Sequence, residues 1–381
     1  MKRNISHFIG LKGIGGVQKN FSETISLLSK EFNNTVYTTG KPDAEYTDTF
    51  SLKIRNIYNP RNLLGLIFDI ISKKKIVHFY NNINSKKLFL LLILLPTKNC
   101  IMHERGSVWN IIARANLIPK LLRNKFILFI ANSDATSRML QYKFQIKKSK
   151  IKVVHNGINT HRHIKKQKNE KFNLGFIGRF EPHKGIHILI NAFHELIDID
   201  KSLKNKINLN FAGDGPLLSL YKTKTACEKN IFFHGRVKDQ YSFIASQDLL
   251  IAPSIREPFG NVFLEAGLCS TPIIASYIDG IPEIIQHNKE GFLIQPTEKI
   301  NKTYLPNNIL DLPEVIYYPK RHNIDFPRQI NHKTLAKTIL ELINNPNKLE
   351  SFALNLHQKV KIKFNVNEYV RKITNIYKSI L

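Results

Sequence analysis

Cysteine and acidic side chains are scarce in this chain of 381 residues, and tryptophan occurs once. Cys100, Cys227 and Cys269 are far apart and odd in number, which argues against a disulfide framework and indicates a reducing compartment. No C-x-x-C pair occurs, which argues against a structural zinc site. Cysteine chemistry is therefore not expected to stabilise the fold.

Long apolar segments are also missing. The longest, Leu88–Pro96, is shorter than the roughly 20 residues of a membrane span and is interpreted as a buried helix. The basic N-terminus leads into an apolar run that Ser6, His7 and glycines interrupt, which favours a first β-strand over a signal peptide. The apolar fraction of 43% is typical of globular proteins. We therefore expect a soluble or peripheral protein of two ordinary domains.

Positive charge is abundant, with 57 basic and 29 acidic side chains and a net charge of +28. Such an excess attracts polyanions: nucleic acid, an anionic membrane surface or an acidic substrate. The alternative is a compositional bias, because Lys, Asn and Ile are common throughout. No nucleic-acid-binding module is recognisable, so nucleic acid is not an expected partner. The basic segment 105–130, which contains Trp109, is interpreted either as a membrane-surface helix or as a helix packed on a sheet.

Short apolar runs alternate with helical patterns along the whole chain. The expected strands of the first half are 5–10, 34–39, 75–80, 100–106, 128–133 and 152–157, and those of the second half are 172–178, 207–213, 231–235, 249–254, 272–276 and 291–294. This alternation predicts an α/β fold with two doubly wound parallel sheets. The polar run 161–171 is the expected linker. The segment 297–332 is irregular and is interpreted as an insertion of unknown role.

The most informative segment is 251–296, where Glu257 and Glu265 stand eight positions apart around Pro-Phe-Gly. An apolar strand precedes them, and the sequence FLEAGL indicates the start of a helix. A strand, a glycine turn and a helix N-terminus favour phosphate binding, because backbone N–H groups and the helix dipole attract anions. Carboxylates beside such a turn accept hydrogen bonds from hydroxyl groups. The pattern therefore predicts a site for a nucleotide-sugar.

These residues resemble the retaining glycosyltransferases of family 4, which have the GT-B fold. Further motifs of this resemblance are GFIGRFEPHKGIHILINAF at 175–193, LNFAGDGPL at 209–217, FFHGRV at 232–237, GIPEII at 280–285 and, more weakly, GIGGVQKN at 13–20. The resemblance implies two Rossmann-like domains that face each other across a cleft. Residues 1–165 would bind the acceptor and 166–362 the nucleotide-sugar, and a helix in 363–381 would cross back to the first domain.

The resemblance also implies roles for individual residues. Arg179 and Lys184 would stabilise the charge that grows on the diphosphate leaving group. Glu257 would face the donor sugar, and His103 would lie near its anomeric carbon, with Glu104 a possible acceptor contact. The catalytic set is His103, Glu257, Arg179 and Lys184, and the donor-binding set is Gly15, Gly16, Arg179, Lys184, Gly235, Arg236, Glu257, Phe259, Gly260, Asn261, Val262 and Glu265.

The activity so implied is metal-independent transfer of a hexose from a UDP- or GDP-sugar, with retention, to a glycan or glycolipid hydroxyl of the bacterial cell envelope, as in lipopolysaccharide or capsule. No cofactor is expected. The protein would lie in the cytoplasm, on the anionic inner face of the cytoplasmic membrane. The alternatives are a soluble or storage-glycan acceptor, or an inactive basic protein that binds membranes or polyanions. Ser270 and Asp279 depart from the family pattern, which has glycine at both positions.

Overall fold

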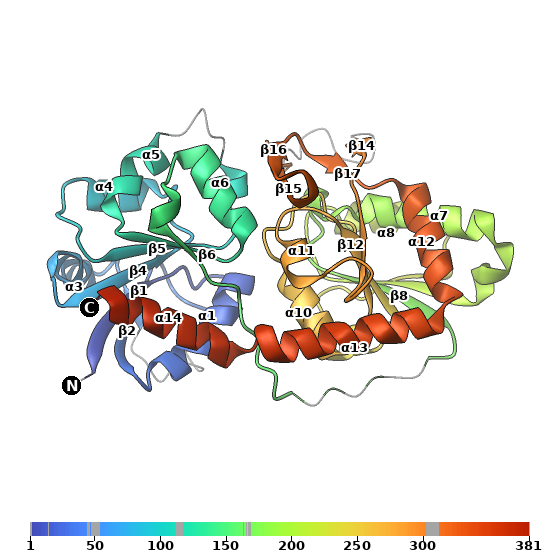
Figure 1. Cartoon of the computed structure of the whole chain (residues 1–381), viewed down its shortest axis with the longest axis horizontal. Coiled ribbons are helices and arrows are strands. Elements are labelled where there is room, and N and C mark those ends of the chain that lie inside the picture. The colour runs from blue at the N-terminus through green and yellow to red at the C-terminus, as the bar shows by residue number, and fades with distance from the viewer. Residues whose placement is uncertain are drawn as a thin grey trace. The chain divides into compact units, whose positions relative to one another are not determined.

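The chain folds into two compact units in the computed structural model. The described residues are 2–13, 15–43, 46, 54–111, 117–162, 164, 166, 169–301 and 312–380. The first unit comprises Met1–Asn159 and Phe364–Leu381, and the second Thr160–Lys363. Each contains one parallel sheet between layers of helices, so the predicted α/β fold with two doubly wound sheets is confirmed (Figure 1).

The sheet of the first unit has seven parallel strands in the order β3-β2-β1-β4-β5-β6-β7. Their bounds are β1 (Arg3–Phe8), β2 (Phe32–Thr38), β3 (Ile54–Asn56), β4 (Lys75–Tyr80), β5 (Cys100–Glu104), β6 (Leu128–Ala131) and β7 (Ile151–Val153). The chain runs from β1 outward to β3 and then returns to place β4 beside β1. In such sheets ligands bind at the carboxyl ends of the strands where the order reverses.

Helices cover both faces of this sheet. They are α1 (Gly16–Leu28), α3 (Pro60–Ile71), α4 (Lys86–Ile93), α5 (Ile118–Leu122), α6 (Asp134–Phe144) and the C-terminal α14 (Val366–Ile380). Figure 1 shows α4, α5 and α6 on one side and α1 and α14 on the other. Leu88 and Leu92 of α4 are buried, but Leu90 and Leu94 are 70% and 88% exposed, so the interpretation of Leu88–Pro96 as a buried helix is wrong.

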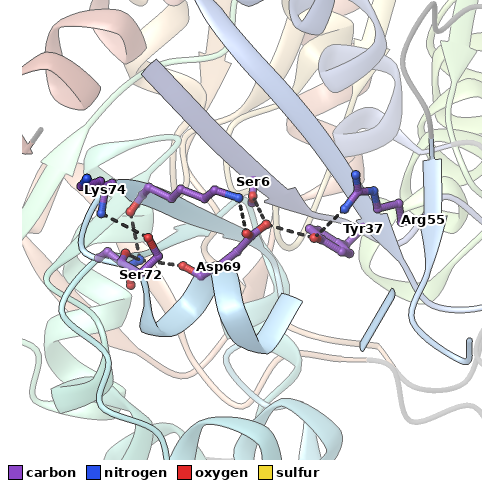
Figure 2. Close-up of polar contacts among 8 residues, drawn as sticks. Ser6, Tyr37, Arg55, Asp69, Ser72 and Lys74 are labelled. Carbon is purple, nitrogen blue, oxygen red and sulfur yellow. Dashed lines mark hydrogen bonds and ion pairs between the residues drawn. The ribbon is translucent and has the colours of Figure 1, made fainter. Parts of the chain in front are cut away.

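Helix α3 is fixed to the sheet by one buried carboxylate (Figure 2). Ser6 of β1 and Tyr37 of β2 donate hydrogen bonds of 2.7 and 2.9 Å to Oδ2 of Asp69, and Lys75 of β4 forms an ion pair with its Oδ1. The Asp69 side chain is only 4% exposed. Ser6 alternates along β1 with Ile5 and His7, whose side chains face α14, so α3 covers the opposite face.

The sheet of the second unit has six parallel strands in the order β10-β9-β8-β11-β12-β13. The strands are β8 (Phe172–Ile177), β9 (Ile207–Ala212), β10 (Ile231–Phe233), β11 (Leu249–Ala252), β12 (Ile273–Ser276) and β13 (Phe292–Ile294). The helices are α7 (Ile186–Ile199), α8 (Leu218–Lys224), α9 (Gln240–Ala245), α10 (Asn261–Leu268), α11 (Ile281–Ile284), α12 (His332–Ile343) and α13 (Pro346–Lys363). The strand order reverses between β8 and β11.

The predicted insertion 297–332 contains two small antiparallel pairs. Strand β14 (Glu298–Lys299) pairs with β17 (Arg328–Gln329), and β15 (Ile316–Tyr318) with β16 (Asn323–Asp325). Residues 302–311 of this segment lie outside the described residues. Within the described ranges, no helix is both long and apolar enough to cross a bilayer.

Candidate functional site

The carboxyl ends of β8 and β11 adjoin where the strand order of the second sheet reverses. Two loops leave these strand ends, 178–185 after β8 and 253–260 after β11. Ile255 donates a backbone hydrogen bond of 2.7 Å to the carbonyl oxygen of His183. Gly185 has φ +70°, and a Cβ there would lie 2.0 Å from the carbonyl oxygen of Pro253. Only glycine therefore allows the two loops to approach so closely.

The two loops bring together the predicted residues Lys184 and Glu257. Nζ of Lys184 lies 2.7 Å from Oε2 of Glu257, and the two side chains are 22% and 10% exposed. Arg179, on the same loop as Lys184, forms an ion pair with Glu181 but is 75% exposed. Both cations are thus paired with carboxylates, and the more exposed of them, Arg179, remains accessible to an anion.

A buried pair that the sequence reasoning missed lies beneath these residues. Nη2 of Arg256 lies 3.1 Å from Nε2 of His183, whose ring is 3% exposed. Burial, and then the positive charges of Arg256 and Lys184, hold the pKa of His183 well below its usual value. A neutral His183 therefore accepts a hydrogen bond from Arg256. His183 lies in the motif at 175–193 and Arg256 in the segment 251–296. Their position in these motifs is the sequence signal that could have identified them as site residues.

Helix α10 begins directly after the loop that carries Glu257. Gly260 precedes it with φ +91°, and a Cβ there would meet the Phe263 ring at 2.3 Å. Phe259 is buried, and Asn261 and Val262 form the first residues of the helix. This helix N-terminus is suited to an anion.

Glu265 lies one turn into α10, as the sequence predicted. Its Oε1 accepts a hydrogen bond of 2.5 Å from Nε2 of Gln240, at the start of α9. Gly235 and Arg236 follow β10, and the carbonyl oxygen of Gly235 accepts a hydrogen bond of 2.7 Å from the backbone of Gly213. Arg236 is exposed. Most of the predicted donor-binding residues thus lie at the carboxyl ends of the strands of the second sheet.

The remaining predicted residues belong to the first unit. Gly15 and Gly16 are exposed at the start of α1. His103 is fully buried at the end of β5, where its ring stacks with His78 at 5.3 Å and Tyr369 at 6.5 Å. Burial, followed by the charge of Arg105, lowers the pKa of His103 well below its usual value. The roles of these residues at a donor site stay predictions.

Two further side chains near β5 are buried. Glu104 accepts a hydrogen bond from the hydroxyl group of Ser107, and burial raises its pKa to about 7. Trp109 is 1% exposed, so it packs within the unit and does not face a membrane. Arg114, in the same basic segment, lies outside the described residues. Across the described ranges, no group of three or more His, Cys, Asp or Glu side chains is arranged to hold a metal ion.

Comparison with known proteins identifies the matching family. Residues 158–305 match the family model of glycosyl transferases group 1. An uncharacterized 41.2 kDa protein from the cps region of Klebsiella pneumoniae is 30% identical over 46% of this chain and 50% of its own length. The capsular polysaccharide biosynthesis glycosyltransferase CapM of Staphylococcus aureus is 26% identical over 35% of this chain and 37% of its own length. The chain thus spans half or less of these curated relatives.

Among solved structures, the fold matches Anabaena Alr3699/HepE, crystallised with UDP and glucose. The TM-score is 0.72, over 99% of this chain and all of that one, at 18% sequence identity. Neighbours of this kind are GT-B glycosyltransferases, so the chain has the GT-B fold.

Proposed function

We propose that this chain, whose segment 158–305 matches the family model of glycosyl transferases group 1, transfers a hexose from a nucleoside-diphosphate sugar to a hydroxyl group. The observation that carries this proposal is the Lys184–Glu257 pair beside the N-terminus of α10. A diphosphate leaving group gains negative charge as its bond to the sugar breaks. Fixed cations and helix N–H groups aimed at that charge lower the barrier.

In the proposed reaction Lys184 and Arg179 hold the diphosphate, Glu257 accepts hydrogen bonds from the sugar hydroxyls and Glu265 from the ribose. Phe259, Gly260, Asn261 and Val262 provide backbone contacts to phosphate and sugar. The two cations compensate the leaving-group charge, so the proposed transfer requires no metal ion. The anomeric configuration is retained by a front-face displacement, in which the departing phosphate oxygen accepts the proton of the acceptor.

The proposed donor is a UDP- or GDP-hexose, and the proposed acceptor is a lipid-linked glycan of the cell envelope. HepE, which binds UDP-glucose, supports the donor class, and the capsule-related relatives support the acceptor class. A soluble or storage glycan is the second acceptor class. Work on a lipid-linked acceptor would place the protein on the inner face of the cytoplasmic membrane.

A thermal-shift panel of UDP, GDP, ADP and their sugar conjugates, without added metal, tests this proposal. We expect one nucleotide to stabilise the protein and Glu265→Ala to abolish that stabilisation. Lys222→Ala is the matched control, because Lys222 is an exposed side chain on α8. If no nucleotide in the panel raises the melting temperature, the proposed UDP- or GDP-hexose donor is wrong, and the alternatives are a donor outside the panel or a basic binding protein that has lost its activity.

A further inference from the structure

Exposed apolar side chains are concentrated on the outer surfaces of α3, α4 and α5. Among the described residues, eight of the fifteen exposed large apolar side chains lie between residues 58 and 121. At each helix, neighbouring members stand one turn apart along the chain, with Leu94 and Leu117 at the caps of α4 and α5, so they form a stripe on the side away from the sheet. We call this surface the α3–α5 face; its apolar members are Tyr58, Leu64, Phe68, Ile71, Leu90, Leu94, Leu117 and Leu121.

The three helices form one continuous surface. Lys87 of α4 donates a hydrogen bond of 2.8 Å to the hydroxyl group of Tyr58, which precedes α3. Lys125, just after α5, donates hydrogen bonds to the carbonyl oxygens of Ile93 and Leu95 at the end of α4. The buried Asp69 fixes the inner side of α3, so Phe68 faces outward at 68% exposure.

The charge around the α3–α5 face has a single sign. Residues 49–133 contain fourteen lysines and arginines and only two acidic residues, Asp69 and Glu104. Both carboxylates are buried. Lys73, Lys74, Lys86 and other basic side chains in this range are exposed. Within residues 49–133, a partner of this face therefore meets apolar side chains and positive charge, and the described residues of this range expose no carboxylate.

We propose that the α3–α5 face docks on an anionic lipid bilayer. Leucine and phenylalanine side chains gain free energy on entering the boundary between headgroups and acyl chains, and surrounding lysines attract anionic headgroups. A second copy of this chain would place like charges against one another, so charge complementarity favours lipid. Docking on a bilayer would bring the protein to the proposed lipid-linked acceptor. The inference rests on the proposed function only in this respect, because bilayer binding is measured without catalysis.

The test is flotation of the full chain with two kinds of vesicle, at about 0.15 M salt. One kind is phosphatidylcholine alone, and the other contains roughly one third phosphatidylglycerol. We expect binding to the anionic vesicles alone. The double variant Phe68→Ser/Leu94→Ser should weaken that binding about tenfold or more, and Lys73→Glu/Lys74→Glu should do the same. The matched controls are Leu354→Ser/Ile362→Ser and Lys333→Glu/Lys337→Glu, all exposed positions of the second unit.

Three results would overturn the docking proposal: no binding of the wild type to anionic vesicles, equal binding by the α3–α5 variants, or a dimer in sedimentation that Phe68→Ser/Leu94→Ser dissociates. The thermal shift that nucleotides cause in the same variants distinguishes failure of docking from failure of the proposed function. If the α3–α5 variants keep the nucleotide-induced thermal shift of the wild type but no longer float with anionic vesicles, docking is supported. Flotation without any nucleotide shift leaves docking in place and removes the glycosyltransferase proposal.

A separate inference concerns Asp279, which stands where the family pattern has glycine. Its side chain is 1% exposed and contacts two backbone segments. Oδ2 accepts a hydrogen bond of 3.0 Å from the backbone N–H of Glu257, and Oδ1 accepts one of 2.8 Å from that of Tyr317. Asp279 and Tyr317 are also joined backbone to backbone at 2.9 Å. One carboxylate therefore links the Glu257 loop to strand β15 of the insertion.

The turn that contains Asp279 and Gly280 also contacts the backbone of the Glu257 loop. Gly280 donates a backbone hydrogen bond of 3.2 Å to the carbonyl oxygen of Glu257. A Cβ on Gly280 would lie 2.2 Å from the carbonyl oxygen of Pro258, so the two segments are in direct contact. Asp279 itself has φ +43°, a left-handed conformation that costs free energy for a residue other than glycine. Two charge-assisted hydrogen bonds offset that cost.

We infer that Asp279 is a positioning residue that couples the β15–β16 hairpin to Glu257. The hairpin fixes Asp279, and Asp279 fixes the backbone from which the Glu257 side chain reaches Lys184. A displacement of about 1 Å at such a group reduces rates on the order of a hundredfold. The inference rests on the proposed function for the role of Glu257, but the hydrogen bonds are observable without it.

Two variants and a control test this coupling. Asp279→Gly removes the carboxylate and suits the left-handed backbone, so it should fold; Asp279→Asn keeps the size but loses the charge. Both should accelerate amide hydrogen exchange at Glu257 and Tyr317. Both should lower kcat with UDP-glucose or GDP-mannose about tenfold or more, while affinity for the bare nucleoside diphosphate changes less than about twofold. Asp325→Asn, on the same hairpin, is the control.

Unchanged exchange at both amides would overturn the coupling whatever the activity of the protein. Unchanged kcat in both variants would do the same. A parallel loss of nucleotide affinity, melting temperature and kcat would make Asp279 a structural residue only. If the wild type binds no nucleotide, the exchange measurement still decides whether the hairpin holds the loop, while the proposed function fails separately.

Discussion

Two groups of polar side chains, one in each unit, differ in their exposure to solvent. In the second unit, Arg179, Lys184 and Glu257 stand at strand ends as ion pairs that solvent reaches in part. In the first unit, His7 and His78 lie in the centre of the sheet at 0% exposure. Nδ1 of His78 is hydrogen-bonded to the hydroxyl group of Tyr377 on α14 at 2.5 Å. The candidate site of the second unit thus carries charges that solvent reaches in part, whereas these histidines of the first unit are fully buried.

This difference has an energetic reason. A buried ion requires a partner or it loses its charge, and burial lowers the pKa of His7 to about 4. A neutral imidazole needs only hydrogen bonds, which Asn34 and Tyr80 provide at 2.9 and 3.2 Å. The first unit therefore depends on the neutral state of its histidines, and the second on the charged state of its site.

The largest effect should come from Lys184→Ala. The change removes the cation beside Glu257 and leaves a carboxylate that is 10% exposed without this partner. We expect kcat to fall about a hundredfold to a thousandfold, because leaving-group charge is no longer compensated. Steady-state transfer with the nucleotide-sugar identified by thermal shift would measure this.

Arg179→Ala provides the comparison within the same loop. Arg179 is 75% exposed, so solvent screens its charge and its removal should reduce kcat less than that of Lys184. If both variants lose activity equally, the two cations act as one unit, and the distinction by exposure is wrong.

The next largest effect should be on stability, through Asp69→Asn in the first unit. The change leaves Lys75 without its ion-pair partner and weakens the bonds from Ser6 and Tyr37. Breaking such a buried pair costs about 3 kcal/mol. Urea unfolding would measure this loss. Asp198→Asn is the control, since Asp198 pairs with Lys201 on the surface and should matter little.

The sequence predicted the second unit better than the first, for a physical reason. The predicted phosphate loops combine glycines at positions with positive φ, Gly185 and Gly260, with charged residues at fixed sequence distances from them. These constraints are local, so GR-x4-KG and E-x7-E are readable from spacing. They located Lys184 and Glu257, which the structure brings to 2.7 Å.

Contacts between residues that are far apart in the chain could not be predicted from the sequence. The bond between His78 and Tyr377 joins residues 299 positions apart, and the Asp279–Tyr317 bond crosses the insertion. Neither pair has a distinctive local pattern. The same limit explains Leu88–Pro96, where uniform apolarity indicated burial although the helix carries Leu90 and Leu94 on its outer side. Burial depends on which face meets the sheet, and periodicity alone did not reveal it.

A pH titration of stability would sharpen the contrast between the units. The pKa of His7 is about 4 when folded and near 6.5 when unfolded. Below pH 6.5 the unfolded chain binds a proton that the native chain does not, so stability falls as the pH drops towards 4. The slope is about 1.4 kcal/mol per pH unit for each such histidine. Among the described residues, the first unit buries three histidines whose pKa is strongly lowered, His7, His78 and His103, and the second unit buries two, His183 and His187. Acid unfolding followed by hydrogen exchange should therefore reach the first unit before the second.

His103→Phe separates two roles in that titration. If His103 only fills the core, the variant keeps its transfer activity. Its free energy of unfolding should then fall less steeply with decreasing pH, by about the contribution of one histidine. If His103 also contacts the donor, activity falls at neutral pH while the melting temperature holds. Loss of both activity and folding would show that the stack with His78 and Tyr369 does not tolerate a benzyl ring.

The smallest expected effects come from a matched pair of glycines, one in each unit. Gly13 and Gly235 have φ +79° and +63°, and a Cβ at either would meet no atom within 4 Å. Alanine at each should cost about 1–2 kcal/mol, because the penalty belongs to the left-handed backbone and not to its surroundings. Urea unfolding should therefore give equal losses. KM for the donor should rise in Gly235→Ala, since Gly235 lies among the predicted donor-binding residues; an unchanged KM in that variant would remove Gly235 from the site.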